Sequence, residues 1–280
     1  MTKDELFQTI QQKKSYLCIG LDSDMEQIPG HLQSKVDPAF YFNKAIVDLT
    51  HDVCVGYKIN TAFYEVQGNK GWRSLEKTAG YIREKYPENF LIADVKRSDI
   101  GNTARQYAET FFSRLDFDAV TLSPYMGKDS VEPFLAYKGK WSILLGLTSN
   151  PGANDFQLTA TDQPEEYLFE RVIKTASQWG TTENMMFVAG ATQTHYLEGI
   201  RQIIPDHFLL VPGIGAQGGN LQELSRAGLN QQGGLLVNAS RSIIFSDPSK
   251  SFDVTARDQA MKINKQMERL LSEKKLLANP

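Results

Sequence analysis

The chain has 280 residues, 41% of them hydrophobic, and a formal net charge of -3 at pH 7. This balance gives no overall basic field, which argues against nucleic acid or an anionic membrane as a partner. No window approaches the roughly 18 uninterrupted apolar residues of a membrane span, and the polar first 14 residues lack the apolar core of a signal peptide. Cys18 and Cys54 lie in separate apolar runs and are expected to be buried free thiols. These features predict a cytoplasmic protein.

Eight short apolar runs alternate along the chain with stretches of helical spacing. Repeated strand-then-helix order is typical of a parallel sheet, and eight repeats favour a closed (β/α)8 TIM barrel over an open doubly wound sheet. No linker or change of composition divides the chain, so residues 1–280 are predicted to form one α/β domain. The predicted strands are 16–21, 53–59, 90–95, 119–122, 142–147, 185–189, 208–211 and 235–237, and the predicted helices include 38–50, 71–86, 102–115, 164–179, 219–227 and 253–272.

The third predicted strand ends in a cluster of charges. Asp94 and Lys96 are two residues apart, which places them on the same face of a strand, and Asp99 follows on the loop before a helix. In α/β enzymes the carboxyl ends of the strands hold the chemistry. An isolated cluster of this kind would more often be a surface ion pair, so its functional interpretation depends on the rest of the chain.

A glycine-rich segment, 212–219, follows the seventh predicted strand. It resembles a dinucleotide-binding loop only superficially, because Pro212 interrupts it and no acidic residue ends a following strand. In a barrel, the loops after strands seven and eight frequently bind phosphate. Arg241 follows strand eight and would supply a charged, bidentate partner. The segment and Arg241 together predict a phosphorylated substrate, although the glycines could also serve only tight turns.

Polar residues follow most of the predicted strands, and in a barrel they would meet at one mouth. Taken singly, Lys58 could be a strand-end lysine that extends to solvent and Asp22 a helix cap. Taken together they predict a cavity with alternating Lys and Asp charges on one wall and a phosphate cradle on the other. The residues concerned are Asp22, Lys58, Asn60, Asp94, Lys96, Asp99, Ser123, Thr148, Ser149, Asn150, Gln217 and Arg241.

These motifs closely resemble those of the orotidine 5'-phosphate decarboxylase family, in particular its longer bacterial branch. The resemblance extends from about residue 17 to residue 244, and the spacing between the Asp-x-Lys-x-x-Asp string and the glycine-rich loop is very specific. Two features differ from shorter relatives: Ser240 stands where they carry glycine, and the insertion between Asn60 and Trp72 is longer. The carriers are Gly20-Leu21-Asp22, Lys58 and the segments 93–103, 148–153, 212–219 and 240–243.

The resemblance implies decarboxylation of orotidine 5'-phosphate to uridine 5'-phosphate, the last step of de novo UMP synthesis, without cofactor or metal. Lys96 would stabilise the carbanion and donate the proton. Partial desolvation would lower the lysine pKa, and flanking carboxylates at Asp94 and Asp99 would oppose this. Lys58, Asp94, Lys96 and Asp99 would form the catalytic array, and substrate would be bound by Asp22, Thr103, Ser149, Pro212, Gln217, Gly218, Ser240 and Arg241.

The resemblance also implies a homodimer in which Asp99 and Thr103 reach into the partner's site. Two other functions stay open at this stage. A related barrel that binds Mg²⁺ and acts on a sugar phosphate would require further acidic residues at neighbouring strand ends, whereas the chain has Lys58 and Ser123 there. A catalytically silent nucleotide-binding barrel would gain little from holding the charge of Lys96 in such a pocket. The four histidines are scattered and are expected at the surface.

Overall fold

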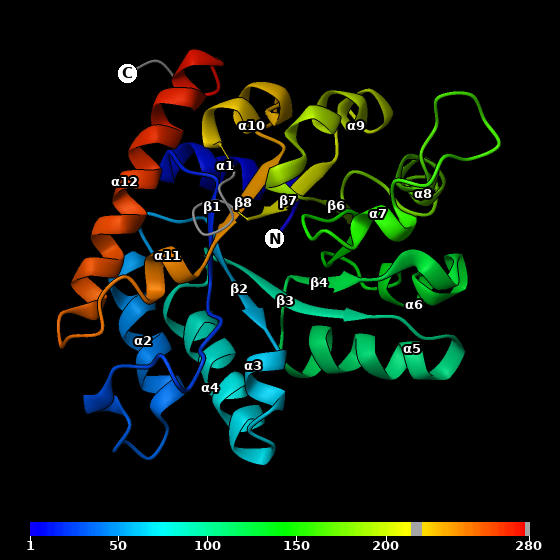
Figure 1. Cartoon of the computed structure of the whole chain (residues 1–280). Coiled ribbons are helices and arrows are strands. Elements are labelled where there is room, and N and C mark those ends of the chain that lie inside the picture. Colours follow the sequence, from blue (N-terminus) through cyan, green and yellow to red (C-terminus); the bar gives the residue numbers. More distant parts are fainter. Residues whose placement is uncertain (214–219, 278–280) are drawn as a thin grey trace.

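A computed structural model describes residues 1–213 and 220–277. Its eight strands are all parallel and form a closed barrel in chain order, which confirms the predicted (β/α)8 fold (Figure 1). Each strand pairs with the next, and β1 pairs with β8 to close the ring. The strands are β1 Leu17–Gly20, β2 Gly56–Asn60, β3 Phe90–Arg97, β4 Ala119–Leu122, β5 Trp141–Leu147, β6 Met185–Ala189, β7 Phe208–Pro212 and β8 Leu235–Ala239.

Helices surround the barrel, as the amphipathic stretches predict (Figure 1). None of the helices in the described ranges is long and apolar enough to cross a membrane. The longer helices are α1 Lys3–Lys13, α2 Pro38–Thr50, α4 Asn69–Lys85, α5 Gly101–Ala108, α8 Leu168–Ala176, α9 Leu197–Ile203, α10 Leu221–Gly228 and α12 Phe252–Glu273, and the short ones are α3 Ala62–Glu65, α6 Glu132–Leu135, α7 Ala153–Phe156 and α11 Arg241–Ile244. Short 3-10 turns span Gly30–Leu32, Pro124–Met126, Lys128–Ser130 and Ala191–Tyr196, and a π-helix spans Glu109–Arg114.

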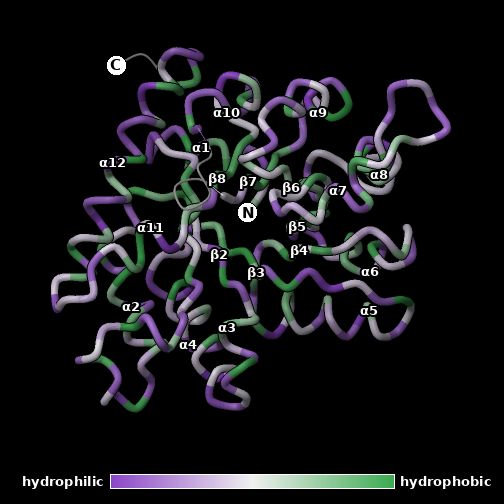
Figure 2. The backbone as a smooth tube through the Cα atoms, in the orientation of Figure 1, coloured by the Kyte–Doolittle hydropathy of each residue, from purple (hydrophilic) through white to green (hydrophobic). Residues whose placement is uncertain are grey.

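Hydrophobic residues concentrate on the strands and on the inner sides of the helices, while hydrophilic residues lie outside (Figure 2). Most strand residues are fully buried, as expected for a parallel sheet covered by helices. Because all strands run the same way, their carboxyl ends meet at one rim of the barrel. The residues predicted to form the site are therefore brought to one end of the fold.

Three boundaries differ from the predicted ones in ways that matter. The polar stretch 1–14 contains helix α1, which begins with a capping box between Thr2 and Glu5 and buries Leu6 and Ile10. Strand β2 begins at Gly56, because residues 53–55, although apolar, belong to the connection between α2 and this strand. Strand β8 continues to Ala239, two residues past the apolar run, so the polar residue Asn238 lies within the barrel wall.

The end of the barrel where the strands begin, here called the floor, is held together by hydrogen bonds. Arg201 on α9 donates hydrogen bonds to the backbone oxygens of Gly228, Ile204, His207 and Gly234. His207 itself is only 9% exposed, and neither ring nitrogen has a hydrogen-bond partner in the described part of the chain. The expectation that all histidines lie at the surface is therefore wrong for His207, because it directly precedes β7 and packs edge-on against Phe187.

Candidate active site

A cavity of about 320 Å³ opens at the carboxyl ends of the strands. Residues from β1, β2, β3, β4, β5, β6, β7 and β8 or from the loops just after them contribute to it, as expected for an active site of this fold. The lining residues are Asp22, Lys58, Asn60, Asp94, Lys96, Thr121, Leu145, Thr148, Ser149, Asn150, Val188, Leu210, Pro212, Gly213, Asn238, Ser240 and Arg241.

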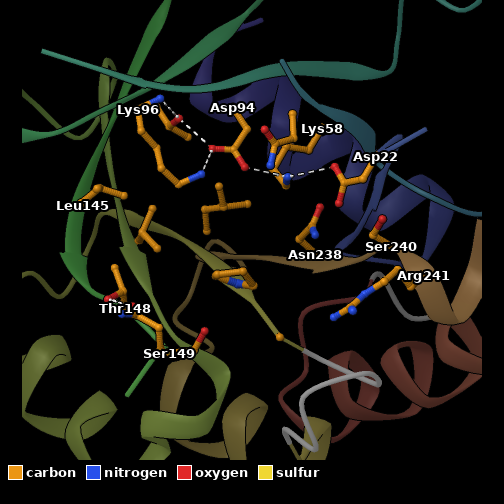
Figure 3. Close-up of a pocket in the computed structure, with 17 residues that line it drawn as sticks. Asp22, Lys58, Asp94, Lys96, Leu145, Thr148, Ser149, Asn238, Ser240 and Arg241 are labelled. Atoms are coloured by element: carbon orange, nitrogen blue, oxygen red, sulfur yellow. Dashed lines mark hydrogen bonds and ion pairs between the residues drawn. The ribbon is translucent and has the colours of Figure 1, made fainter. Parts of the chain in front are cut away.

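Four charged side chains stand in a row along one side of the cavity (Figure 3). Lys96 Nζ donates to Asp94 Oδ1 at 2.6 Å, and Lys58 Nζ donates to Asp94 Oδ2 at 2.8 Å. Asp22 Oδ1 lies 3.7 Å from Lys58 Nζ. The alternating charges predicted from the sequence are therefore present, but within one chain the row ends in Asp22 and does not include Asp99.

The central pair of the row is held in its charged form. Burial by itself lowers the pKa of Lys58, but Asp94 and then Asp22 act against it, and the net direction is upward. Burial raises the pKa of Asp94, but the charges of Lys58 and Lys96 outweigh it, and the net direction is downward. At neutral pH, Asp94 is thus ionised between two ammonium groups.

Lys96 differs from the central pair in its exposure. Its side chain is 50% exposed, whereas that of Lys58 is 5% exposed. Burial therefore falls mainly on Lys58 and Asp94, and Lys96 is half-buried, because Lys96 lies at the end of β3, where the barrel opens. Its ammonium group is held by Asp94 on one side and reaches the cavity on the other.

The backbone at Lys96 is irregular. Its φ is 46°, in the left-handed region, which costs an L-residue on the order of 1–2 kcal/mol. The pairing of β3 with β4 also shifts between Ala93 and Arg97, where four steps along β3 match two along β4. Regular strand alternation predicts that Asp94 and Lys96 share a face, and the two side chains are indeed in contact. The contact forms across a bulge, however, which regular alternation does not predict.

The predicted phosphate arginine lies beside Ser240 at the Asp22 end of the charged row, away from Lys96 (Figure 3). Arg241 is exposed, and its guanidinium has no hydrogen bond or ion pair with the described residues. The preceding Ser240 donates to the backbone oxygen of Gly20 at 3.0 Å. A Cβ on Gly20 would lie 2.8 Å from Ser240 Cβ, so Gly20 leaves the space that a serine requires at this position.

The structure brings most of the predicted site residues together, but not all of them. Ser149 and Pro212 line the cavity with the charged row. Asp99 and Thr103 do not line it; Asp99 Oδ1 accepts from the Ile100 amide, and Thr103 is exposed on α5. Gln217 and Gly218 lie outside the described residues.

Two polar cavity residues received no role from the sequence. Asn238 is buried in β8, and its Oδ1 has no hydrogen-bond partner in the described ranges. The sequence gives it no role because the apolar run that predicts strand eight ends at residue 237, one residue before Asn238. Thr121 lies in a strand whose bounds were predicted correctly, but a β-branched residue in a strand gives no local signal of function.

The chain matches other proteins over most of its length. Residues 15–252 match the model of the "Orotidine 5'-phosphate decarboxylase / HUMPS family". Two proteins named orotidine 5'-phosphate decarboxylase are similar to it: one from Phocaeicola vulgatus, 56% identical over 97% of this chain and 99% of the relative, and one from Bacteroides fragilis, 57% identical over 95% and 97%.

A solved structure shares the fold as well. The UMP synthase of Leishmania donovani is 35% identical with a TM-score of 0.80, over 94% of this chain and 56% of that longer chain. The present chain therefore spans just over half of that protein. The family match over residues 15–252, together with the identity to the bacterial relatives, shows that this chain belongs to the orotidine 5'-phosphate decarboxylase family.

Proposed function

We propose that the protein converts orotidine 5'-phosphate to uridine 5'-phosphate and CO2 without a cofactor, and that Lys96 donates the replacing proton. Family membership implies the final step of UMP biosynthesis. The observation that carries the finer proposal is the position of Lys96 Nζ, which is held at 2.6 Å by an ionised Asp94 and reaches the cavity. The proposal takes residues 1–280 as one catalytic domain.

The proposed reaction requires a fixed electrostatic field and one proton. When the bond between the pyrimidine ring and the carboxylate breaks, CO2 departs and the electron pair stays on an sp2 ring carbon that has no adjacent carbonyl to delocalise it. An ammonium group next to that carbon stabilises the developing charge. Lys96 then transfers a proton to the carbon and is left as a neutral amine, which regains a proton from water. Asp94 and Lys58 orient the ammonium group throughout.

Substrate binding is assigned to the residues that the family resemblance implies. Asp22 and Lys58 would hold the ribose hydroxyls, and Ser149 the pyrimidine edge. Arg241, with Ser240 beside it, would hold the phosphate. Gln217 would fill the gap between base and phosphate, and Pro212 and Gly218 would also bind the substrate. The support for Arg241 is that it faces the cavity without a partner among the described residues. Phosphate binding energy would help to exclude water from the charged row.

The decisive test is a direct assay of the purified protein. Orotidine 5'-phosphate is incubated with the protein and a chelator, and the ultraviolet absorbance of the substrate is followed. Loss of the substrate spectrum with release of one CO2 per nucleotide is the expected result. No change would overturn the proposal. Activity that appears only with Mg²⁺, and on a sugar phosphate, would instead favour the related Mg²⁺-binding barrel that the sequence left open.

We further propose a homodimer in the cytoplasm in which Asp99 and Thr103 complete the partner's site. The first support is that both residues closely follow the cavity residue Lys96 in the sequence but do not line the cavity of their own chain. The second is that Ile100, between them, is a half-exposed apolar side chain. The location is supported by two cysteines that are buried and free.

Mixing two inactive variants tests the shared site. Asp99→Ala and Lys96→Ala proteins should each be nearly inactive, and they should regain activity when subunits exchange. A heterodimer has one site with both defects and one with neither, so random mixing restores about a quarter of all sites under two-fold symmetry. If no activity returns while mass spectrometry shows complete exchange, Asp99 acts within its own chain and the shared site is wrong.

A further inference from the structure

Thr121 on β4 contacts three groups of the charged strand at once. Its Oγ1 accepts hydrogen bonds from the Val95 amide at 2.9 Å and from the Lys96 amide at 3.0 Å. The same hydroxyl donates to Asp94 Oδ1 at 2.9 Å. A hydroxyl group has one proton and two lone pairs, so these three bonds use its full capacity. The side chain is 1% exposed, which leaves no room for water to replace it.

The two amides that Thr121 accepts belong to the bulge in β3. In a regular strand, consecutive amides point to opposite neighbours, so only one of these two would face β4. Here the pairing shifts between Ala93 and Arg97, and both amides donate to the same hydroxyl on β4. Without this acceptor, the buried Val95 amide and the partly buried Lys96 amide would lose the bonds that they make here. The Thr121 hydroxyl is therefore the group that makes the left-handed conformation of Lys96 compatible with a closed barrel.

The third bond fixes the carboxylate that holds Lys96. Asp94 Oδ1 receives both Thr121 Oγ1 and Lys96 Nζ, while Oδ2 receives Lys58 Nζ. Thr121 Oγ1 therefore fixes both the backbone of Lys96 and, through Asp94, its ammonium group.

From these contacts we infer that Thr121 is a positioning residue for Lys96, an inference that rests on the proposed function. The hydroxyl holds the ammonium group where the charge of the transition state develops, without touching the substrate itself. Loss of the hydroxyl is then expected to affect the chemical step more than substrate binding, because the phosphate and ribose contacts lie on other strands.

The test compares two substitutions at this position. Thr121→Val keeps the shape and removes the hydroxyl, and should lower kcat about 10- to 100-fold while KM and the affinity for uridine 5'-phosphate change less than about threefold. Thr121→Ser keeps the hydroxyl and should restore kcat to within about fivefold of the wild type. Equal losses in the Val and Ser variants, or an unchanged kcat in the Val variant, would overturn the inference.

A matched control separates positioning from stability. Thr50 on α2 is also fully buried, and its hydroxyl bonds to Ile46 O at 2.7 Å and Tyr57 Oη at 2.9 Å, away from the cavity. Thr50→Val makes the same chemical change there and should lower the urea midpoint without lowering kcat. If kcat follows the urea midpoint in both Val variants, Thr121 has only a structural role.

A crystal structure of the Thr121→Val protein gives a readout that does not depend on turnover. Lys96 should leave its left-handed conformation, or its Nζ should move away from Asp94 Oδ1. An unchanged Lys96 would overturn the inference whatever the activity of the protein. Conversely, a displaced Lys96 in a protein whose wild type does not decarboxylate orotidine 5'-phosphate would refute the proposed function alone. If the Val variant does not fold, Thr121→Ala is examined in the same way.

Discussion

The two ends of the barrel use polar and charged side chains differently. At the amino ends, Arg201 gives hydrogen bonds to four backbone oxygens, and the buried Asp118 accepts one from the Leu91 amide. At the carboxyl ends, Arg241 has no partner among the described residues, and the buried Asn238 Oδ1 accepts no hydrogen bond there. Arg201 and Asp118 are bonded to backbone groups at the floor, whereas Arg241 and Asn238 keep unused hydrogen-bonding capacity at the mouth.

This difference separates stability from function along the barrel axis. A group that the protein already satisfies contributes to folding, and its removal leaves buried partners unbonded. A group with unused capacity contributes little until a ligand arrives. Substitutions at the mouth should therefore change kinetics with little change in the free energy of unfolding, and substitutions at the floor should do the reverse.

The largest effect is expected at Lys96. Lys96→Ala should lower kcat by about 10³-fold or more, since it removes both the charge of the ammonium group and the proposed proton donor. Stability should hardly change, because Asp94 keeps its bonds to Lys58 and Thr121. Steady-state kinetics, product affinity and a urea titration measure the three quantities. A variant that keeps more than about a tenth of the wild-type kcat would remove Lys96 from its proposed role.

Arg241 should have the next largest effect, and mainly on KM. Its guanidinium would bind phosphate in both the ground state and the transition state, so Arg241→Ala should raise KM about 100-fold, which corresponds to one strong charge-assisted interaction. Arg241→Lys is the matched control, since it keeps the charge but loses the bidentate geometry. Its KM should lie between those of the wild type and the alanine variant. An unchanged KM in the alanine variant would place the phosphate elsewhere.

The fold could be predicted more fully than the site, for a physical reason. Eight apolar runs alternating with amphipathic stretches leave few alternatives to a closed barrel, and the charged residues follow from their places at strand ends. Asn238 could not be found in this way, since its strand extends past the apolar run. Thr121 acquires its role only from an irregularity in the neighbouring β3, which depends on pairing and not on local sequence. Asp99 and Thr103 stay predictions, because their proposed partner is another chain.

At the floor, Arg201→Met should reduce the free energy of unfolding by about 2 kcal/mol, because backbone oxygens lose their donor in a largely buried place. Kinetic constants at 25 °C should stay within about twofold of the wild type, since Arg201 lies at the opposite end from the cavity. Arg226→Met, on an exposed part of α10, is the control and should change stability by less than about 0.5 kcal/mol. A large loss of kcat in a folded Arg201→Met protein would contradict the separation of the two ends.

The smallest effect concerns pH and the floor residue His207, whose ring nitrogens have no hydrogen-bond partner in the described part of the chain. Burial, together with the positive charges of Lys3 and Arg201, lowers the pKa of His207 to about 4, against a weaker opposing effect of Asp206. Because the unfolded chain binds this proton with a pKa near 6.5, it holds more protons than the folded chain between about pH 6.5 and 4, and stability must fall as the pH falls through that window. From pH 7 to 5.5 the loss should be about 1 kcal/mol.

Urea unfolding at several pH values measures this loss, and His207→Phe supplies the control, since it keeps an aromatic ring beside Phe187 but cannot bind the proton. The variant should lose less stability than the wild type over the same window. The lowered pKa of Asp94 does not interfere, because its contribution is lost only at a pH below the ordinary value for an aspartate, near 3.9. Equal pH dependence in both proteins would show that His207 is not held neutral, and that the floor is more open to water than its bonding indicates.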